Sequence, residues 1–161
     1  MAQDLSRFLT QTIERELPSL RTFDDERASV ARAPGKWSAK EELGHLIDSA
    51  ANNHMRFVRG ATEPEFRGPG YAQEDWVRLN GYRDMKWETV IAFWFQYNTL
   101  LAGLLGKIPQ DRLETLCFIG ANKPVTLGFV IEDYILHMQH HIDQLLGRQT
   151  IRTYPGATAK D

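Results

Sequence analysis

The chain has 161 residues, of which 42% are hydrophobic and 25% charged, and its formal net charge is −2. This length suits one domain of ordinary size, so we expect a single domain spanning residues 1–161. The composition excludes a disordered or fibrous chain, and the near balance of basic and acidic side chains argues against a nucleic-acid-binding protein.

Three sequence features concern the compartment. The single cysteine, Cys117, cannot form an intramolecular disulfide. The first residues lack the apolar segment of a signal peptide. The longest all-apolar run, residues 90–95, is far shorter than the ~20 residues that cross a bilayer. We therefore expect a cytoplasmic protein without a membrane partner.

Helical periodicity dominates the first part of the chain. It predicts a helix over residues 5–17 that stops before Pro18. A second helix begins at a capping box, in which Ser38 and Glu41 satisfy each other's backbone amides, and it ends at Gly60. Both segments are long enough to span a small helical domain.

An irregular segment rich in glycine and proline follows over residues 60–73 and predicts a surface loop. A short helix is expected over residues 74–80. A third long helix should then run from about residue 84 to residue 105. Its middle, residues 90–95, is apolar on all sides, which predicts the helix most enclosed by its neighbours.

The fourth long helix should begin at Thr126, a good N-cap residue, and end at Gly147. The tail over residues 148–161 is expected to be irregular. Four long helices with few strand signals indicate an all-α protein, specifically a four-helix bundle.

Two histidines of the fourth helix point to metal chemistry. His137 and His141 are four residues apart, so their side chains lie on one helix face and can hold one metal ion. Such a pair also occurs often as an ordinary surface pair. The pair alone therefore does not establish a metal site.

His45 on the second helix strengthens the metal hypothesis. The apolar residues of that helix fall on one face, which comprises Leu43, Leu46, Ile47, Ala50, Phe57 and Val58. His45 points away from this face, along an unbroken polar line formed by Glu41, Ser49, Asn52 and Arg56. A plain solvated helix face is the competing interpretation.

The remaining two histidines separate from these three. His54 falls in the middle of the apolar face, which predicts a buried structural histidine, and His140 projects away from the apolar face of the fourth helix. The candidate ligands are therefore His45, His137 and His141, from two helices that a bundle can bring together.

Three neutral imidazoles without a fourth protein ligand are typical of a catalytic metal site with an open position. Zn²⁺ and Ni²⁺ both accept imidazole, so the sequence leaves both open. Glu42, Asp48 and Asp133 are nearby carboxylates that could orient a ligand histidine, or be ordinary solvated charges.

Two segments resemble a known family. The first is Gly-Lys-Trp-Ser-Ala-Lys-Glu-Glu-Leu-Gly-His-Leu-Ile-Asp-Ser over residues 35–49. The second is Val-Thr-Leu-Gly-Phe-Val-Ile-Glu-Asp-Tyr-Ile-Leu-His-Met-Gln-His-His-Ile-Asp-Gln-Leu over residues 125–145. Together they are similar to the signatures of the DinB-like, also called YfiT-like, superfamily of metal-dependent hydrolases, and the similarity covers most of the chain.

This resemblance implies an up-down-down-up four-helix bundle that frequently forms a homodimer. It also implies a divalent metal ion held by one histidine of the second helix and two of the fourth, here His45, His137 and His141. Characterised relatives include transferases and isomerases that use low-molecular-weight thiols. Neither fold nor family transfers a substrate.

We therefore predict a metal-dependent enzyme, either a hydrolase or a thiol S-transferase, that activates water or a thiol for a small-molecule substrate. Tyr71, in the irregular segment, could contact that substrate or belong to a lid. The alternative is a non-catalytic, metal-binding, stress-associated dimer, in which Arg56 or a partner subunit seals the site.

A di-iron carboxylate site is a third hypothesis, because Glu42 and His45 form a Glu-x-x-His motif. Such a site needs a second motif of this kind, which the fourth long helix lacks.

Overall fold

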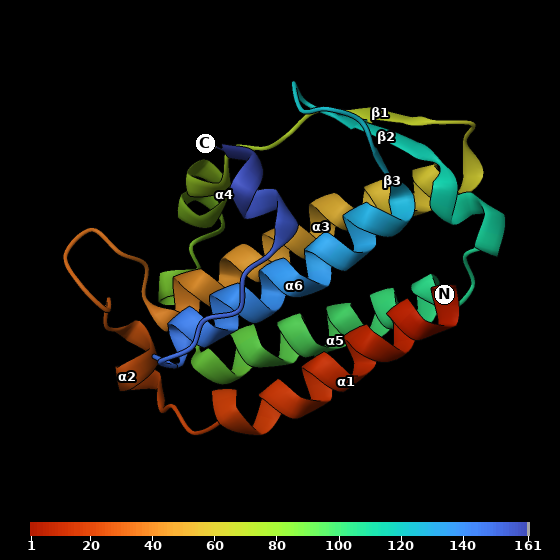
Figure 1. Cartoon of the computed structure of the whole chain (residues 1–161). Coiled ribbons are helices and arrows are strands. Elements are labelled where there is room, and N and C mark those ends of the chain that lie inside the picture. Colours follow the sequence, from red (N-terminus) through yellow and green to blue (C-terminus); the bar gives the residue numbers. More distant parts are fainter. Residues whose placement is uncertain (161) are drawn as a thin grey trace.

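A computed structural model describes residues 1–160 of the chain. Four long helices form the body of the molecule (Figure 1): α1 (Ala2–Leu20), α3 (Ala39–Thr62), α5 (Trp87–Leu105) and α6 (Leu127–Leu145). Helices α1 and α6 run in one direction, and α3 and α5 run in the other. The expected all-α, up-down-down-up four-helix bundle is confirmed.

The helices do not pack in chain order. Helix α1 packs against α5 and α6, and α3 packs against the same two helices. Consecutive long helices α1 and α3 therefore lie diagonally across the bundle. The same arrangement makes α3 and α6 neighbours, which brings the two histidine-bearing helices side by side.

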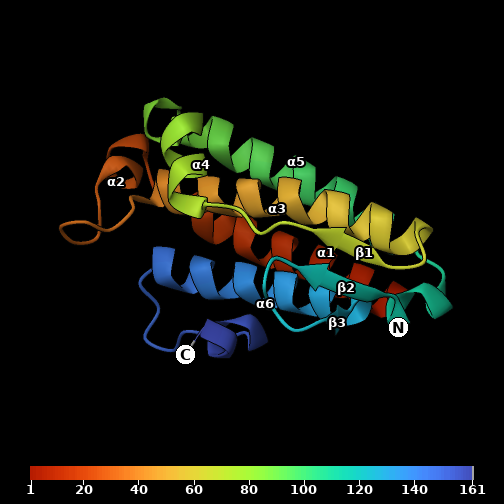
Figure 2. The same ribbon diagram turned by 90° about the horizontal axis from the view of Figure 1, so that it is seen from above.

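The short elements carry the chain between the long helices: α2 (Asp25–Ser29), β1 (Phe66–Gly68), α4 (Gln73–Asn80), β2 (Leu116–Ile119), β3 (Val125–Thr126) and 3₁₀ turns at Tyr82–Asp84, Gln110–Glu114 and Pro155–Lys160. Strand β1 pairs in parallel with β2, and β2 pairs antiparallel with β3. This small sheet lies on one side of the bundle (Figure 2). Because β1 and α4 return the chain to the starting end of α3, α5 runs parallel to α3.

The two predicted N-caps, Ser38 and Thr126, are confirmed. The Ser38 side chain accepts a hydrogen bond from the Glu41 amide, and the Glu41 carboxylate accepts one from the Ser38 amide. At the start of α6, the Thr126 hydroxyl accepts from the Phe129 amide. Both caps fix the position at which a histidine-bearing helix begins.

Proline does not end α1 as expected. The helix continues through Pro18 to Leu20. Proline removes the hydrogen bond to the carbonyl of Glu14, but both residues are exposed, so that carbonyl can bond to water instead. The burial of Leu20 in the core favours the extra turn.

Gly60 is likewise inside α3 rather than at its end. Its lack of a side chain admits Leu127, whose Cδ1 would lie 2.9 Å from an added Cβ. The prediction of a surface loop over residues 60–73 is therefore wrong in part, because this segment contains the last turn of α3 and strand β1. Gly60 therefore allows Leu127 to pack closely against α3 and does not end the helix.

The prediction that α5 is the most enclosed helix is also wrong. Phe93 is 51% exposed and Leu100 is 58% exposed, although Trp94 between them is fully buried. Val58 on α3, expected in the core, is 41% exposed. The additional apolar side chains of these helices therefore lie on the surface of the bundle and not in its core.

Within the described residues, no helix is both long and apolar enough to cross a membrane. The tail, expected to be irregular, ends in a 3₁₀ turn at Pro155–Lys160. It is anchored on α6, because Arg152 donates hydrogen bonds to Asp143 and the Gly156 amide donates to Asp133.

Candidate metal centre

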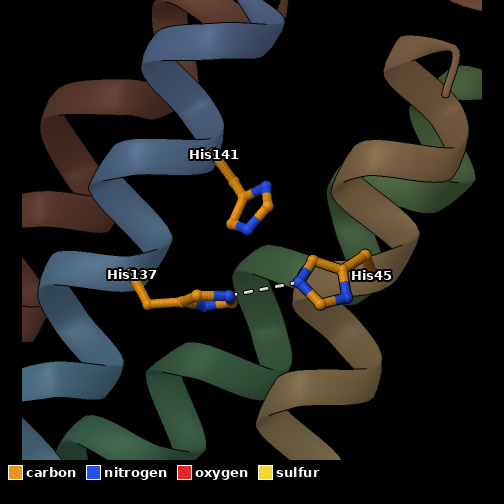
Figure 3. Close-up of side chains that lie close together, drawn as sticks. All are labelled: His45, His137 and His141. Carbon is orange, nitrogen blue, oxygen red and sulfur yellow. Dashed lines mark hydrogen bonds between the residues drawn. The ribbon is translucent and has the colours of Figure 1, made fainter. Parts of the chain in front are cut away.

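The three histidines selected from the sequence meet at the seam between α3 and α6. His45 projects from α3, and His137 and His141 project from α6, one turn apart (Figure 3). The Nε2 atoms of His45 and His137 are 3.2 Å apart. One ligand nitrogen from each ring lies within 4.8 Å of the other two. Among the described residues, this cluster contains no carboxylate, which favours a mononuclear site over a di-iron carboxylate site.

The spacing of these nitrogens fits one metal ion. Imidazole nitrogens bind Zn²⁺ at about 2.0–2.1 Å, so two tetrahedral ligands lie about 3.3 Å from each other. The His45–His137 separation already matches this value. The His141 nitrogen lies within 4.8 Å of both of these atoms. The donor set and its geometry therefore fit a divalent ion such as Zn²⁺ or Ni²⁺.

The polar line on α3 faces the interior of the bundle rather than solvent. His45 is 1% exposed, and Ser49 on the next turn is 3% exposed. The interpretation of a plain solvated helix face is therefore wrong for this part of the line. Sequence periodicity placed His45 opposite the apolar face, but only the packing of α6 against α3 buries that opposite face as well.

Glu42 holds His141 in place. Its Oε1 accepts a hydrogen bond from Nδ1 of His141 at 2.7 Å, and its Oε2 accepts one from Arg32 at 3.0 Å. Because a carboxylate only accepts hydrogen bonds, the proton of neutral His141 is on Nδ1 and the Nε2 lone pair is left for a metal. Of the three carboxylates considered from the sequence, Glu42 is the one in contact with a candidate ligand, His141.

The other two carboxylates have different partners. Asp48 Oδ1 accepts hydrogen bonds from the Tyr82 hydroxyl at 2.6 Å and from Asn80 at 2.8 Å. Burial raises the pKa of Asp48, and these two donors offset the effect only in part. Asp133 accepts from the Gly156 amide, and burial raises its pKa as well.

Aromatic rings flank the histidines. The Trp37 ring lies 5.0 Å from the His45 ring, and the Tyr154 ring lies 5.0 Å from that of His137. They shield the imidazoles from water on two sides. Trp37 belongs to the segment singled out in the sequence, but the contact of Tyr154 was missed because its tail has no periodic pattern.

The remaining histidines and the cysteine lie outside the cluster. His54 is half-buried rather than buried, and its Nδ1 is 3.2 Å from the Tyr97 hydroxyl. His140 bonds to the Arg152 carbonyl and to Gln144. Cys117 is buried, and burial raises the pKa of its thiol to about 11, which disfavours a nucleophilic role.

One member of the cluster, His141, lines a cavity of about 490 Å³. Its other walls include Glu42, Trp37, Arg32, Gln144 and Ile151. Its size is that of a small-molecule site. Arg56, considered as a residue that could seal the site, bonds instead to Asn53 and to the Pro69 carbonyl.

Comparison with known proteins agrees with this geometry. The DinB superfamily model matches residues 9–145, so the chain belongs to the DinB superfamily. A Geobacillus thermodenitrificans protein named "Putative metal-dependent hydrolase" is 24% identical over 90% of this chain and 84% of its own length. A Bacillus licheniformis protein of the same description is 22% identical over 74% of this chain and 69% of its own length.

The fold is also that of a solved structure. YfiT from Bacillus subtilis, described as a "probable metal-dependent hydrolase with an unusual four-helix bundle topology", superimposes with a TM-score of 0.81. It is 18% identical, and the match covers 92% of this chain and 86% of that one.

Proposed function

We propose that this protein is a metal-dependent enzyme whose single divalent ion, Zn²⁺ or Ni²⁺, is held by His45, His137 and His141. The observation that carries the proposal is the convergence of the three imidazoles beside a cavity, with His141 oriented by Glu42. When bound, such an ion lowers the pKa of water or of a thiol and so supplies a nucleophile near neutral pH. The reaction classes that use this chemistry are hydrolysis and thiol S-transfer.

The protein's own residues prepare the site for such a reaction. Glu42 fixes the tautomer of His141, and Trp37 and Tyr154 cover the outer faces of His45 and His137. The adjoining cavity would admit a small-molecule substrate on the open side of the cluster. This opening favours an enzyme over the alternative of a sealed, non-catalytic metal-binding protein, which would offer no access to a substrate.

The test is metal content, measured by plasma mass spectrometry on untagged protein. Wild type should contain close to one equivalent of metal, whereas His45→Ala and His137→Ala should each lose it. His54→Ala is the matched control, because this histidine lies on the same helix outside the cluster and should leave the metal unchanged. A wild type that takes up neither zinc nor nickel would refute the proposal, and so would a His45→Ala variant that keeps its metal.

We infer further that the protein is a homodimer. Met55 and Val58 on α3 and Phe93 and Leu100 on α5 are all more than 40% exposed, on two neighbouring helices. Contiguous exposed apolar side chains are typical of an interface, and a two-fold dimer would cover them symmetrically. Light scattering should give twice the chain mass for wild type and the single chain mass for Phe93→Glu.

A further inference from the structure

Arg56 lies on the same buried polar stripe of α3 as His45. At 100° per residue the two positions are about 20° apart around the helix and about 16 Å apart along it. Ser49 and Asn52 lie between them on this stripe, where Ser49 is 3% exposed and Asn52 is half-buried. The stripe is therefore a row of neutral polar side chains that begins at the histidine cluster and ends at a cation.

The Arg56 guanidinium has only neutral hydrogen-bond partners within the part of the chain that the structure describes. It donates to the side-chain carbonyl of Asn53 at 3.3 Å and to the backbone carbonyl of Pro69 at 3.5 Å, both long contacts. Burial lowers the pKa of Arg56, as expected for a cation withdrawn from water without a compensating carboxylate. A half-buried guanidinium in this situation favours an anionic ligand.

Other arginines show that this situation is specific to Arg56. Arg59, on the next turn, forms a two-bond ion pair with Glu63 at 2.7 and 2.9 Å. Arg112 also binds neutral oxygens, but these are the carbonyls of Gly60, Ala61 and Glu63 at the end of α3, so it caps that helix. Neither role is available to Arg56, because its neighbours three and four residues away on α3 include no carboxylate: they are Asn52, Asn53, Arg59 and Gly60.

The Arg56 side chain leans toward the N-terminal end of α3, the end that carries His45. Side chains on a helix lean toward its N-terminus, and the bond to Asn53 places the guanidinium nearer to that residue. Tyr71, in the segment between β1 and α4, lies close to Ser49, one turn from His45. Burial raises the pKa of Tyr71 to about 12, so its hydroxyl keeps its proton at neutral pH and can donate to an anion.

We propose that Arg56 and Tyr71 form a subsite for an anionic group, a carboxylate or a phosphate, on the molecule that reacts at the histidine cluster. This inference rests on the proposed function for the role of the cluster. The substrate class is therefore a small molecule that carries a carboxylate or a phosphate apart from its reactive group.

The test is titration of the metal-loaded, ¹⁵N-labelled protein with inorganic phosphate at constant ionic strength. The Arg56 Nε–H signal and the amides of residues 70–72 should shift with saturation in the millimolar range, as expected for one small-anion contact. Arg56→Gln should weaken binding by at least about tenfold, and Arg56→Lys, which keeps the charge, should weaken it less. Arg59→Gln is the matched control and should leave the phosphate affinity unchanged.

The His45→Ala variant separates this subsite from the metal centre. It should lose metal but still bind phosphate at Arg56, so failure of the proposed function and failure of this subsite give different results. Equal affinity in Arg56→Gln and wild type would overturn the subsite. Phosphate shifts that disappear in His45→Ala would also overturn it, because the anion would then bind at the cluster. No saturable binding in wild type up to about 50 mM would have the same meaning.

Discussion

Replacement of Glu42 by glutamine tests whether the carboxylate that is hydrogen-bonded to His141 matters for metal binding. Glutamine keeps the shape of the side chain but removes the negative charge of the carboxylate. In the wild type, Oε1 of this carboxylate accepts the hydrogen bond from Nδ1 of His141 at 2.7 Å. Loss of such a partner typically weakens metal affinity by about 10- to 100-fold. This factor corresponds to about 1.4–2.7 kcal/mol of binding free energy.

The substitution should affect binding more than folding. Arg32, the other partner of Glu42, is 39% exposed at its side chain and can turn into water when the carboxylate is lost. The free energy of unfolding of the metal-free protein, measured in urea, should therefore fall by only about 1 kcal/mol. Zinc affinity, measured by competition with a chromophoric chelator, should fall by the larger amount.

Glu41→Gln is the control on the adjacent residue. Glu41 accepts from the Ser38 amide in the capping box, a role that glutamine also fulfils, and it has no contact with His141. Its zinc affinity should stay within about twofold of wild type. Wild-type affinity in Glu42→Gln, or an equal loss in both variants, would refute the assignment of Glu42 as the residue that orients His141.

Two further predictions concern residues that stabilise α3 and α6, the helices that carry the site. Burial acts to raise the pKa of Asp143, but hydrogen bonds from Arg152 and Arg148 outweigh it and hold that pKa well below its usual range. The pairing therefore adds stability that is present above the unfolded-state pKa and is lost as the pH falls below about 4. Asp143→Asn should lower the unfolding free energy at pH 7 by about 2 kcal/mol and flatten its decline in acid, and an unchanged acid limb in urea unfolding would contradict this. Gly44→Ala would push a Cβ into the Tyr82 ring, so thermal unfolding should show a loss of about 1–3 kcal/mol, and an unchanged Tm would contradict the packing argument.

The sequence predicts correctly those features that depend only on residues close together in the chain. Ser38 and Thr126 were predicted as caps because each contacts backbone amides within three residues, and such contacts need no tertiary information. The spacing of His137 and His141 follows from helix geometry alone. Helical periodicity also separated His45 from the apolar face of α3. These local features were enough to select the three candidate ligands.

Packing between distant segments decided the rest. The sequence alone predicts a helix end at Gly60, because it does not show that Leu127 packs against this residue. Phe93 was assigned to an enclosed helix because periodicity cannot tell a core face from an exposed apolar one.

At the site itself, the sequence determined which residue types and spacings can bind a metal. The tertiary structure decided that the polar face of α3 is buried against α6. It also decided that Glu42 rather than Asp48 contacts His141, and that the Tyr154 ring packs against His137. The physical reason is that a helix fixes the angles between its own side chains, whereas their burial and partners depend on which other helix packs against each face.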